Sequence, residues 1–303
     1  MKVLFMGTPD FAAVCLNKLL ASSHSVVGVV TQPDRAVKRG KIELPPVKSL
    51  ALERGLTVYQ PEKIGRICDT LKDLGADIGV TAAFGQLLPQ SVIDVFPKGI
   101  INVHGSILPK YRGASPVQSA IMNGETQTGV TIMQTELGLD SGDILAVKKT
   151  DIGLQETGGE LMARLADIGG ELLVETLDNF DCIKPIKQNH AEATVCKTIK
   201  KSEQYFDFCE DNVSVVNKIR ALSPSPCAKT VICGEVYKLY AAECSDETGE
   251  AGKIIRCDKA LIIGCKNGSV SIKKIQAPGK RALDIDEFLR GKKLPIGEVC
   301  GKI

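Results

Sequence analysis

The feature that most constrains the fold is the regular alternation of apolar runs and amphipathic stretches along the first part of the chain. Short apolar runs, typical of buried strands, cover residues 2–7, 26–31, 56–59, 77–82 and 99–104. Stretches with apolar residues at helical spacing cover residues 10–21, 47–55, 61–74 and 157–180. Strands that alternate with helices form a parallel sheet covered by helices on both faces. We therefore predict an α/β fold with an open, mostly parallel, doubly wound sheet of Rossmann-like type.

The pattern changes after residue 180, where a polar stretch containing a proline is predicted to be a linker. Helices are predicted over residues 213–222 and 284–290, with short β-like runs between them at 228–233, 235–241, 253–257, 260–265 and 269–275. Short strands separated by turns favour a small five-stranded OB-like β-barrel. A chain of 303 residues is long enough for two cores. We divide it into an α/β catalytic domain at 1–180, a linker at 181–202 and a barrel domain at 203–303.

What the sequence lacks disfavours several functional classes. It contains neither G-x-G-x-x-G after its first strand nor a G-x-x-x-x-G-K-[ST] loop, so we expect no nicotinamide or P-loop nucleotide site. No apolar run approaches the ~20 residues of a membrane span, and the first residues are predicted as a strand, not a signal peptide. The 11 cysteines form no C-x-x-C pair, which favours free thiols in a reducing cytoplasm over disulfides or a metal site.

The strongest candidate site lies where the fifth predicted strand ends, in INVHGSILPKYRG at residues 101–113. Alternate side chains of a strand share a face, so Asn102 and His104 point together at its carboxyl end, where open α/β sheets bind ligands. A carboxylate, Asp140, follows in the glycine-flanked turn LGLDSGD between two β-like runs. An amide, an imidazole and a carboxylate form a plausible acid–base group. A lone histidine near a strand end is more often structural, and spacing alone leaves both interpretations open.

A long basic loop spans residues 32–48 and carries Arg35, Lys38, Arg39, Lys41 and Lys48. It is either a solvated surface loop or a basic finger that contacts phosphates. After residue 190 the chain is mildly basic although its net charge is only +2, which is compatible with a polyanionic partner. Lys197, Lys200 and Lys201 are a second candidate phosphate contact, for which a charged linker is the favoured interpretation.

Several segments resemble the methionyl-tRNA formyltransferase family. They are GTPDFA after the first strand, TQPDR leading into the basic loop that ends in PPVK, INVHGSILPKYRG, GVTIMQTELGLDSGDIL and IQAPGKRAL. The matches are collinear from residue 2 to about residue 290. The motifs that contain His104 and Asp140 are shared with other enzymes that use 10-formyltetrahydrofolate, whereas the PPVK loop and the terminal barrel point to the tRNA-specific family. Ile107 stands where a leucine is usual, and the chain has no tryptophan.

The resemblance implies transfer of a formyl group from 10-formyltetrahydrofolate, without a metal, to the α-amino group of methionyl initiator tRNA. Asn102, His104 and Asp140 are then the catalytic trio. The other implied site residues are Ser106, Ile107, Leu108 and Pro109 for folate, and Arg39, Lys38, Lys41 and Lys197 for tRNA. Amine attack on a formyl carbon passes through a tetrahedral oxyanion, which Asn102 and a protonated His104 would stabilise. Asp140 would keep His104 charged and help remove the amine proton. We expect a cytoplasmic monomer with no membrane contact.

Two other functions remain as alternatives. A folate-dependent formyltransferase acting on a small amine, such as a glycinamide ribotide or an amino sugar, shares the active-site strand and has no need of the basic loop or barrel. A non-catalytic RNA-binding protein with an α/β platform leaves the coincidence of Asn102, His104 and Asp140 with the folate-loop motif unexplained. Product analysis distinguishes the first alternative, and folate binding distinguishes the second.

Overall fold

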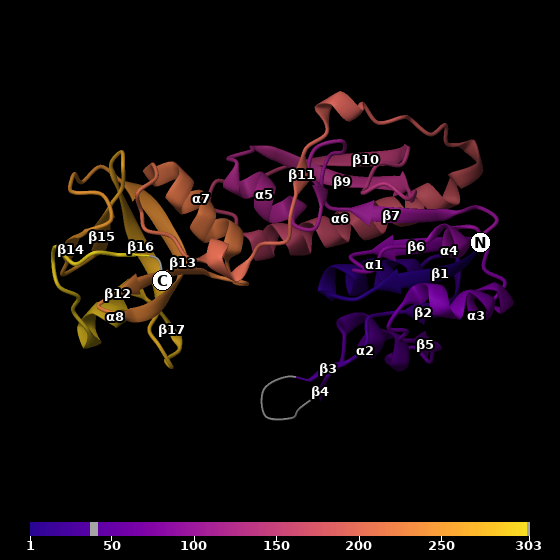
Figure 1. The fold of residues 1–303 in the computed structure, drawn as a ribbon, viewed down its shortest axis with the longest axis horizontal. Coiled ribbons are helices and arrows are strands. Elements are labelled where there is room, and N and C mark those ends of the chain that lie inside the picture. Colours follow the sequence, from indigo (N-terminus) through magenta and orange to yellow (C-terminus); the bar gives the residue numbers. More distant parts are fainter. Residues whose placement is uncertain (37–41, 302–303) are drawn as a thin grey trace. The chain divides into compact units, whose positions relative to one another are not determined.

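A computed structural model describes residues 1–36 and 42–301 of the protein (Figure 1). The chain divides into two compact units. Unit 1 comprises Met1–Pro116, Gln127–Asp151 and Met162–Cys196, and unit 2 comprises Val117–Thr126, Ile152–Leu161 and Lys197–Ile303. No helix among the described residues is long and apolar enough to cross a membrane.

Unit 1 is built on a seven-stranded sheet with the order β10-β9-β7-β6-β1-β2-β5. Its strands are β1 (Lys2–Gly7), β2 (Ser25–Val30), β5 (Val58–Tyr59), β6 (Ile78–Ala82), β7 (Ile100–His104), β9 (Gln127–Gln134) and β10 (Ile144–Asp151). Strands β5, β2, β1, β6 and β7 are parallel, whereas β9 runs antiparallel to β7 and β10 antiparallel to β9. The predicted mostly parallel, doubly wound sheet is confirmed. Strands β2 and β5 lie on one side of β1, whereas β6 and β7 lie on the other, so the strand order switches direction at β1. Ligands of open α/β sheets bind at such a switch point.

Helices cover both faces of this sheet. They are α1 (Asp10–Leu20), α2 (Pro46–Glu53), α3 (Cys68–Asp73), α4 (Gln90–Ile93) and α6 (Gly158–Asp178). On one face, Leu4 and Met6 of β1 pack with Leu71 of α3 and Val92 of α4. On the other face α6 packs closely against the sheet. A Cβ at Gly169 of this helix would stand only 2.9 Å from Val103 Cγ1 of β7. A glycine is needed there for helix and sheet to approach so closely.

The helix predicted over 61–74 is interrupted. A 3₁₀ turn, η2 (Ile64–Ile67), precedes α3, and the backbone at Ile67 leaves the helical region with φ −117° and ψ 21°. Gly65 lies inside the turn, and glycine disfavours a continuous helix by about 1 kcal/mol relative to alanine. Two further short elements, β3 (Arg35–Ala36) and β4 (Ile42–Glu43), pair antiparallel on either side of the undescribed residues 37–41.

The segment after α6 returns onto unit 1. It contains the 3₁₀ turns η3 (Phe180–Cys182) and η4 (His190–Glu192) and the strand β11 (Val195–Cys196). Ile186 forms an antiparallel bridge with Ile144 at the start of β10. Further on, β11 pairs in parallel with β8 (Arg112–Gly113). Residues 183–196 therefore lie along the part of unit 1 that follows β7 and β9.

Unit 2 contains a six-stranded antiparallel sheet with the order β12-β13-β16-β15-β14, to which β17 adds through β16. Its elements are α5 (Pro116–Met122), the 3₁₀ turn η5 (Lys201–Gln204), α7 (Asn212–Leu222), β12 (Ala228–Ile232), β13 (Glu235–Ser245), β14 (Ile254–Cys257), β15 (Leu261–Gly264), β16 (Ser269–Gln276), β17 (Ala282–Asp284) and α8 (Ile285–Gly291). Residues of α7, the sheet and α8 share one core that includes Ile219, Tyr237 and Phe288.

The two edge strands of this sheet are joined by the segment at residues 297–301. Gly301 exchanges two backbone hydrogen bonds with Val231 of β12, of 2.9 and 3.0 Å. On the other side, Ile254 of β14 donates to the carbonyl of Glu298 at 3.0 Å. The segment thus closes the curled sheet toward a barrel, as full closure removes exposed edges. The predicted OB-like domain is confirmed, with β17 as an additional strand.

Candidate active site

Asn102 and His104 lie at the carboxyl end of β7, on the face opposite the buried Ile101 and Val103. Asn102 pairs in register with Thr81 of β6, whose hydroxyl donates to Asn102 Oδ1 over 2.9 Å. Because the amide oxygen accepts this bond, the Nδ2 group is the part of the amide left to donate to a ligand. Asn102 as a whole is half-buried.

His104 is buried, with 5% of its surface exposed. Its Nε2 lies 2.9 Å from the carbonyl oxygen of Tyr111. A carbonyl only accepts, so Nε2 carries a proton and donates it there. The other ring nitrogen, Nδ1, is 3.7 Å from Asp140 Oδ2. The Tyr111 carbonyl therefore determines which ring nitrogen faces the carboxylate.

Asp140 lies in the loop between β9 and β10, which begins beside the start of β7 and extends toward His104. The loop after β9 starts beside β7, where Thr135 N donates to Ile100 O over 2.7 Å. Asp140 Oδ2 accepts a 2.7 Å hydrogen bond from Gly113 N. Its backbone is left-handed, with φ +44°, a conformation that costs a non-glycine residue free energy. The structure thus brings together His104 and Asp140, with Asn102 on the same strand face as His104.

The loop after β7 is held by internal hydrogen bonds. Ser106 is fully buried, and its hydroxyl donates to Lys110 O over 2.7 Å. Thr131 of β9 donates to Ser106 O at 2.7 Å and accepts from Leu108 N at 3.2 Å. Leu108 is buried as well, whereas Ile107 and Pro109 are half-buried. Of the four predicted folate-contacting residues, only Ile107 and Pro109 present accessible side chains.

Two buried polar residues that our sequence interpretation missed adjoin Asp140. They are Arg112, 8% exposed, and Gln188, 5% exposed. Arg112 stands inside the quoted YRG motif, so a signal was present, although a charged residue there suggests surface. Gln188 lies in the polar stretch after α6, and nothing in its local sequence marks it as buried.

The predicted tRNA-contacting residues lie apart from this group in the sequence. Lys38, Arg39 and Lys41 fall outside the described residues. Lys197 is exposed and is the first residue of the third segment of unit 2. At the base of the loop, Lys48 Nζ pairs with Asp34 Oδ2 over 2.6 Å, and this hydrogen bond, followed by one from Gln60, lowers the pKa of the Asp34 carboxyl.

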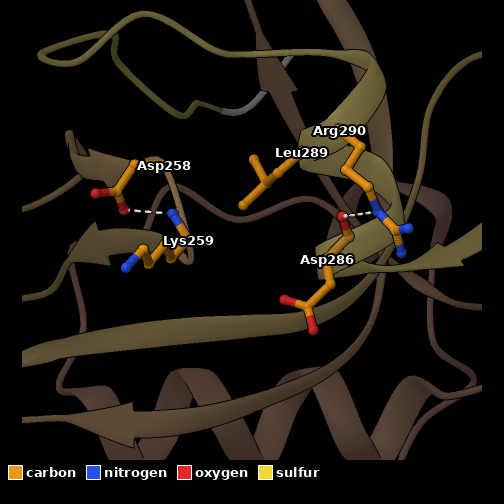
Figure 2. Close-up of a pocket in the computed structure, with 5 residues that line it drawn as sticks. All are labelled: Asp258, Lys259, Asp286, Leu289 and Arg290. Atoms are coloured by element: carbon orange, nitrogen blue, oxygen red, sulfur yellow. Dashed lines mark hydrogen bonds between the residues drawn. The ribbon is translucent and has the colours of Figure 1, made fainter.

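A separate surface cavity of about 290 Å³ lies in unit 2 and is lined by Asp258, Lys259, Asp286, Leu289 and Arg290 (Figure 2). Asp258 accepts from the backbone of Lys259 over 2.5 Å, and Arg290 Nε donates to the carbonyl of Asp286 over 3.2 Å. Charges of both signs surround the cavity and bond locally, so nothing there converges on a ligand. The group in unit 1, with buried polar side chains, is the better candidate for chemistry.

Three buried cysteines are unsuited to act as nucleophiles. All 11 cysteines of the chain are free. Burial raises the pKa of the Cys15, Cys265 and Cys300 thiols to about 12, so these thiols stay protonated and unreactive. Among the described residues, no group of three or more histidine, cysteine or acidic side chains could hold a metal ion.

Comparison with known proteins identifies the family. The formyl transferase model matches residues 1–177, and the model of the formyl transferase C-terminal domain matches residues 198–293. A methionyl-tRNA formyltransferase of Lachnospira eligens is 41% identical, with 100% of both chains covered. The chain belongs to the methionyl-tRNA formyltransferase family. Another methionyl-tRNA formyltransferase, from Streptococcus mutans, is 43% identical, with 99% of each chain covered. The resemblance seen in the sequence motifs is confirmed, and the protein is an enzyme.

Solved structures agree with the formyltransferase fold. An N-formyltransferase of Helicobacter canadensis, solved with folinic acid and dTDP-3-aminofucose, superposes with a TM-score of 0.70 at 18% identity. The match covers 91% of this chain and 99% of that one. At this identity the likeness concerns the fold alone, and it extends through both units.

Proposed function

We propose that the protein transfers the formyl group of 10-formyltetrahydrofolate to the α-amino group of methionyl initiator tRNA. The observation that carries the proposal is the placement of Asp140 against His104 Nδ1 at 3.7 Å, beside Asn102, in a chain whose relatives are named methionyl-tRNA formyltransferases over their full length. The product would be N-formylmethionyl-tRNA, used in translation initiation.

Each member of the trio has a distinct role in the proposal. Asn102 Nδ2 and Nδ1–H of a protonated His104 donate to the formyl oxygen as it becomes an oxyanion; Nδ1 is free to do so because its 3.7 Å distance to Asp140 Oδ2 is too long for a hydrogen bond. Stabilising that developing charge contributes most to the rate of such reactions. Because Nε2–H of His104 is committed to Tyr111 O, an unprotonated Nδ1 would turn its lone pair toward the Asp140 carboxylate. In the proposal, Nδ1 therefore carries the proton that His104 donates to the formyl oxygen.

Asp140 also has an oxygen available for the acceptor amine. Its Oδ2 accepts from Gly113 N, whereas Oδ1 accepts no hydrogen bond from the described residues. The amine nitrogen forms its bond to the formyl carbon and gives up a proton to Oδ1, directly or through a water. The bond from the formyl carbon to the folate nitrogen then breaks, and that nitrogen takes a proton. No covalent bond to the enzyme forms.

The folate seat is assigned to the loop of residues 106–109. Ile107 and Pro109 offer half-buried apolar surface, and the hydrogen bonds of Ser106 and Thr131 hold the loop in one shape. A preformed apolar surface of this kind suits a flat heterocycle. The bound folate supplies the formyl group; the protein supplies orientation and charge.

On the tRNA side, we propose that Lys38, Arg39, Lys41 and Lys197 contact phosphates near the acceptor end. Supporting this, all four are basic, and Lys197 is exposed. We further propose that the protein is a monomer. We also propose that it lies in the cytoplasm, because free cysteines persist in reducing compartments.

A formyltransferase acting on a small amine is the second candidate. It is favoured by one observation, the Helicobacter canadensis neighbour whose structure contains dTDP-3-aminofucose. The 18% identity to that protein, against 41% to a methionyl-tRNA formyltransferase, makes it the weaker proposal.

A formylation assay decides between these candidates. The purified protein is given 10-formyltetrahydrofolate with charged initiator methionyl-tRNA, charged elongator methionyl-tRNA, glycinamide ribotide or an amino sugar nucleotide, and formylated products are quantified. We expect rapid formylation of the initiator tRNA alone. Preferential formylation of a small amine would overturn the proposal in favour of the second candidate.

A further inference from the structure

The carboxamide of Gln188 holds the backbone on both sides of Ser141. Its Nε2 donates to the carbonyl of Asp140 over 2.9 Å and to that of Gly142 over 2.7 Å. Both hydrogens of one amide group are therefore used by a single turn of the Asp140 loop. Gln188 is 5% exposed, so water competes little for these bonds.

Arg112 determines which way this carboxamide faces. Its Nε and Nη2 donate to Gln188 Oε1 over 3.1 and 2.7 Å. A guanidinium only donates, so it must meet the oxygen of the carboxamide and thereby directs the nitrogen toward the Asp140 loop. Nη2 also lies 3.1 Å from His190 Nδ1, which consequently accepts.

The turn that Gln188 holds contains a residue in an unfavourable backbone conformation. Asp140 has φ +44°, in the left-handed region that disfavours residues other than glycine. Residues kept in such conformations depend on surrounding contacts to stay there, and they cluster at functional sites. Asp140 accepts hydrogen bonds from Gly113 N on its side chain and from Gln188 Nε2 on its carbonyl.

We propose that Gln188, oriented by Arg112, is a positioning residue that fixes the carboxylate of Asp140 beside His104. The inference rests on the proposed function, because it assigns Gln188 a role only through Asp140. It also gives residues 183–196, which return onto unit 1 through the Ile186 bridge and β11, a part in catalysis.

The test uses two variants of Gln188 in the full chain. Gln188→Met keeps the length of the side chain and removes both donors. Gln188→Glu keeps an oxygen for Arg112, which holds it as an ion pair, and turns its second oxygen toward carbonyl oxygens that need a donor. We expect both variants to lower kcat about tenfold to a hundredfold, since misplacing a catalytic group by ~1 Å costs up to ~10²-fold. KM for folate and for charged tRNA should stay within about twofold.

Gln204→Met is the matched control. Gln204 is a buried glutamine of unit 2, 7% exposed, whose Oε1 accepts from Lys229 Nζ over 2.7 Å. The substitution repeats the chemical change without touching the Asp140 loop. We expect kcat within about twofold of wild type, and thermal unfolding of each variant shows whether the fold is kept. If Gln188→Met fails to fold, Gln188→Glu carries the test alone.

A double-mutant cycle with Asp140→Ala separates positioning from a general structural role. If Gln188 acts through Asp140, Gln188→Glu lowers single-turnover activity less than about twofold once Asp140 is gone. The inference is overturned if both Gln188 variants keep wild-type kcat, or if the full loss persists without Asp140. Wild-type kcat for Asp140→Ala would instead overturn the catalytic assignment on which the inference depends.

Discussion

At the scale of single residues, the site is defined by backbone groups as much as by side chains. The Tyr111 carbonyl fixes the proton of His104 on Nε2, and Gly113 N receives Asp140 Oδ2. Tyr111 has φ +59° and Gly113 has φ +112°. The segment that follows β7 therefore has left-handed backbone at two points, and this conformation presents these two groups. The side chains of His104 and Asp140, which we propose to be catalytic, are thus aligned by a short stretch of chain.

Removing either of the other two members of the proposed trio should abolish most of the activity. We expect Asn102→Ala and Asp140→Ala to lower kcat by ~10²–10⁴ each, because oxyanion donors and general bases contribute in that range. Glu136→Gln, on the same loop but exposed, is the control and should stay near wild type. Steady-state formylation kinetics measure the effect. Near wild-type turnover in a folded Asn102→Ala or Asp140→Ala variant would contradict the assignment.

At Gly142 the absence of a side chain matters for the stability of the fold. A Cβ there would lie 1.9 Å from the carbonyl oxygen of Gln134, a backbone atom that cannot move aside. We expect Gly142→Ala to reduce the free energy of unfolding by about 1–3 kcal/mol, as overpacking does, and to displace Asp140. Gly55→Ala, at a φ of +68° with open space around it, should cost only about 1 kcal/mol from backbone strain. Thermal denaturation compares the two, and equal losses would show that the contact with Gln134 is readily relieved.

At the scale of elements, short pieces of secondary structure do the aligning. The two-residue pair of β8 with β11 connects the segment carrying Arg112 to the segment that follows Gln188.

In unit 2, a single side chain, that of Asp211, caps the helix α7. Its carboxylate accepts from Ser214 N over 2.9 Å and from Ser214 Oγ over 2.7 Å. The backbone hydrogen bond, and then the hydroxyl one, lower the pKa of Asp211.

The cap of α7 should therefore stabilise unit 2 in a pH-dependent way. Asp211→Ala is expected to cost about 0.5–2 kcal/mol at pH 7. Because folding lowers the pKa of Asp211, its contribution is present above the unfolded pKa of about 4 and is lost as the pH falls through the folded value. Denaturant unfolding of both proteins from pH 7 to about pH 2 should show the curves converging. Asp211→Asn, a cap that does not titrate, is the control, and a gap between wild type and Asp211→Ala that stays constant with pH would contradict the linkage.

At the scale of the whole molecule, the residues proposed for chemistry lie in one of the two units, whereas those proposed for tRNA binding occur in both. The trio lies in unit 1, whereas the curled sheet of unit 2 is closed by its own segment at residues 297–301. The basic residues proposed for tRNA occur in the loop of unit 1 that includes Arg39 and at Lys197 in unit 2. Recognition of the polyanion should consequently vary independently of the chemical step.

Salt and Arg39 test this independence. Release of counterions makes phosphate binding weaken steeply with ionic strength, so KM for charged tRNA should rise with salt while KM for folate changes little. Arg39→Ala should raise KM for tRNA and reduce its dependence on salt, with kcat preserved. Steady-state kinetics between about 50 and 200 mM salt provide the measurement. If the KM for tRNA does not change with salt concentration, this result would argue for a small-molecule acceptor.

Much of this architecture follows from local patterns. The parallel strands and their helices were predictable because burial imposes a period of two on strands and 3.6 on helices. That Asn102 and His104 share one strand face was predictable from the period of two. Spacing alone left open whether Asp140 belongs with them, and the resemblance to the family supplied that link. The antiparallel direction of β9 was not predictable, since periodicity carries no direction. Gln188 was hidden for a related reason: its burial depends on where a polar segment returns, and that is decided by distant partners.

The return of residues 183–196 also bears on how the site is completed during synthesis. Asn102, His104 and Asp140 all leave the ribosome before the segment that contains Gln188 and β11. Since domains tend to fold as their residues emerge, the nascent chain holds the whole trio for a time without the carboxamide that secures it. A nascent chain stopped at the end of α6 would have every side chain that we propose to be catalytic, but Asp140 would lack the hydrogen bond from Gln188. Activity should therefore arise late in translation, with the emergence of residues 183–196 and not with the last of the trio.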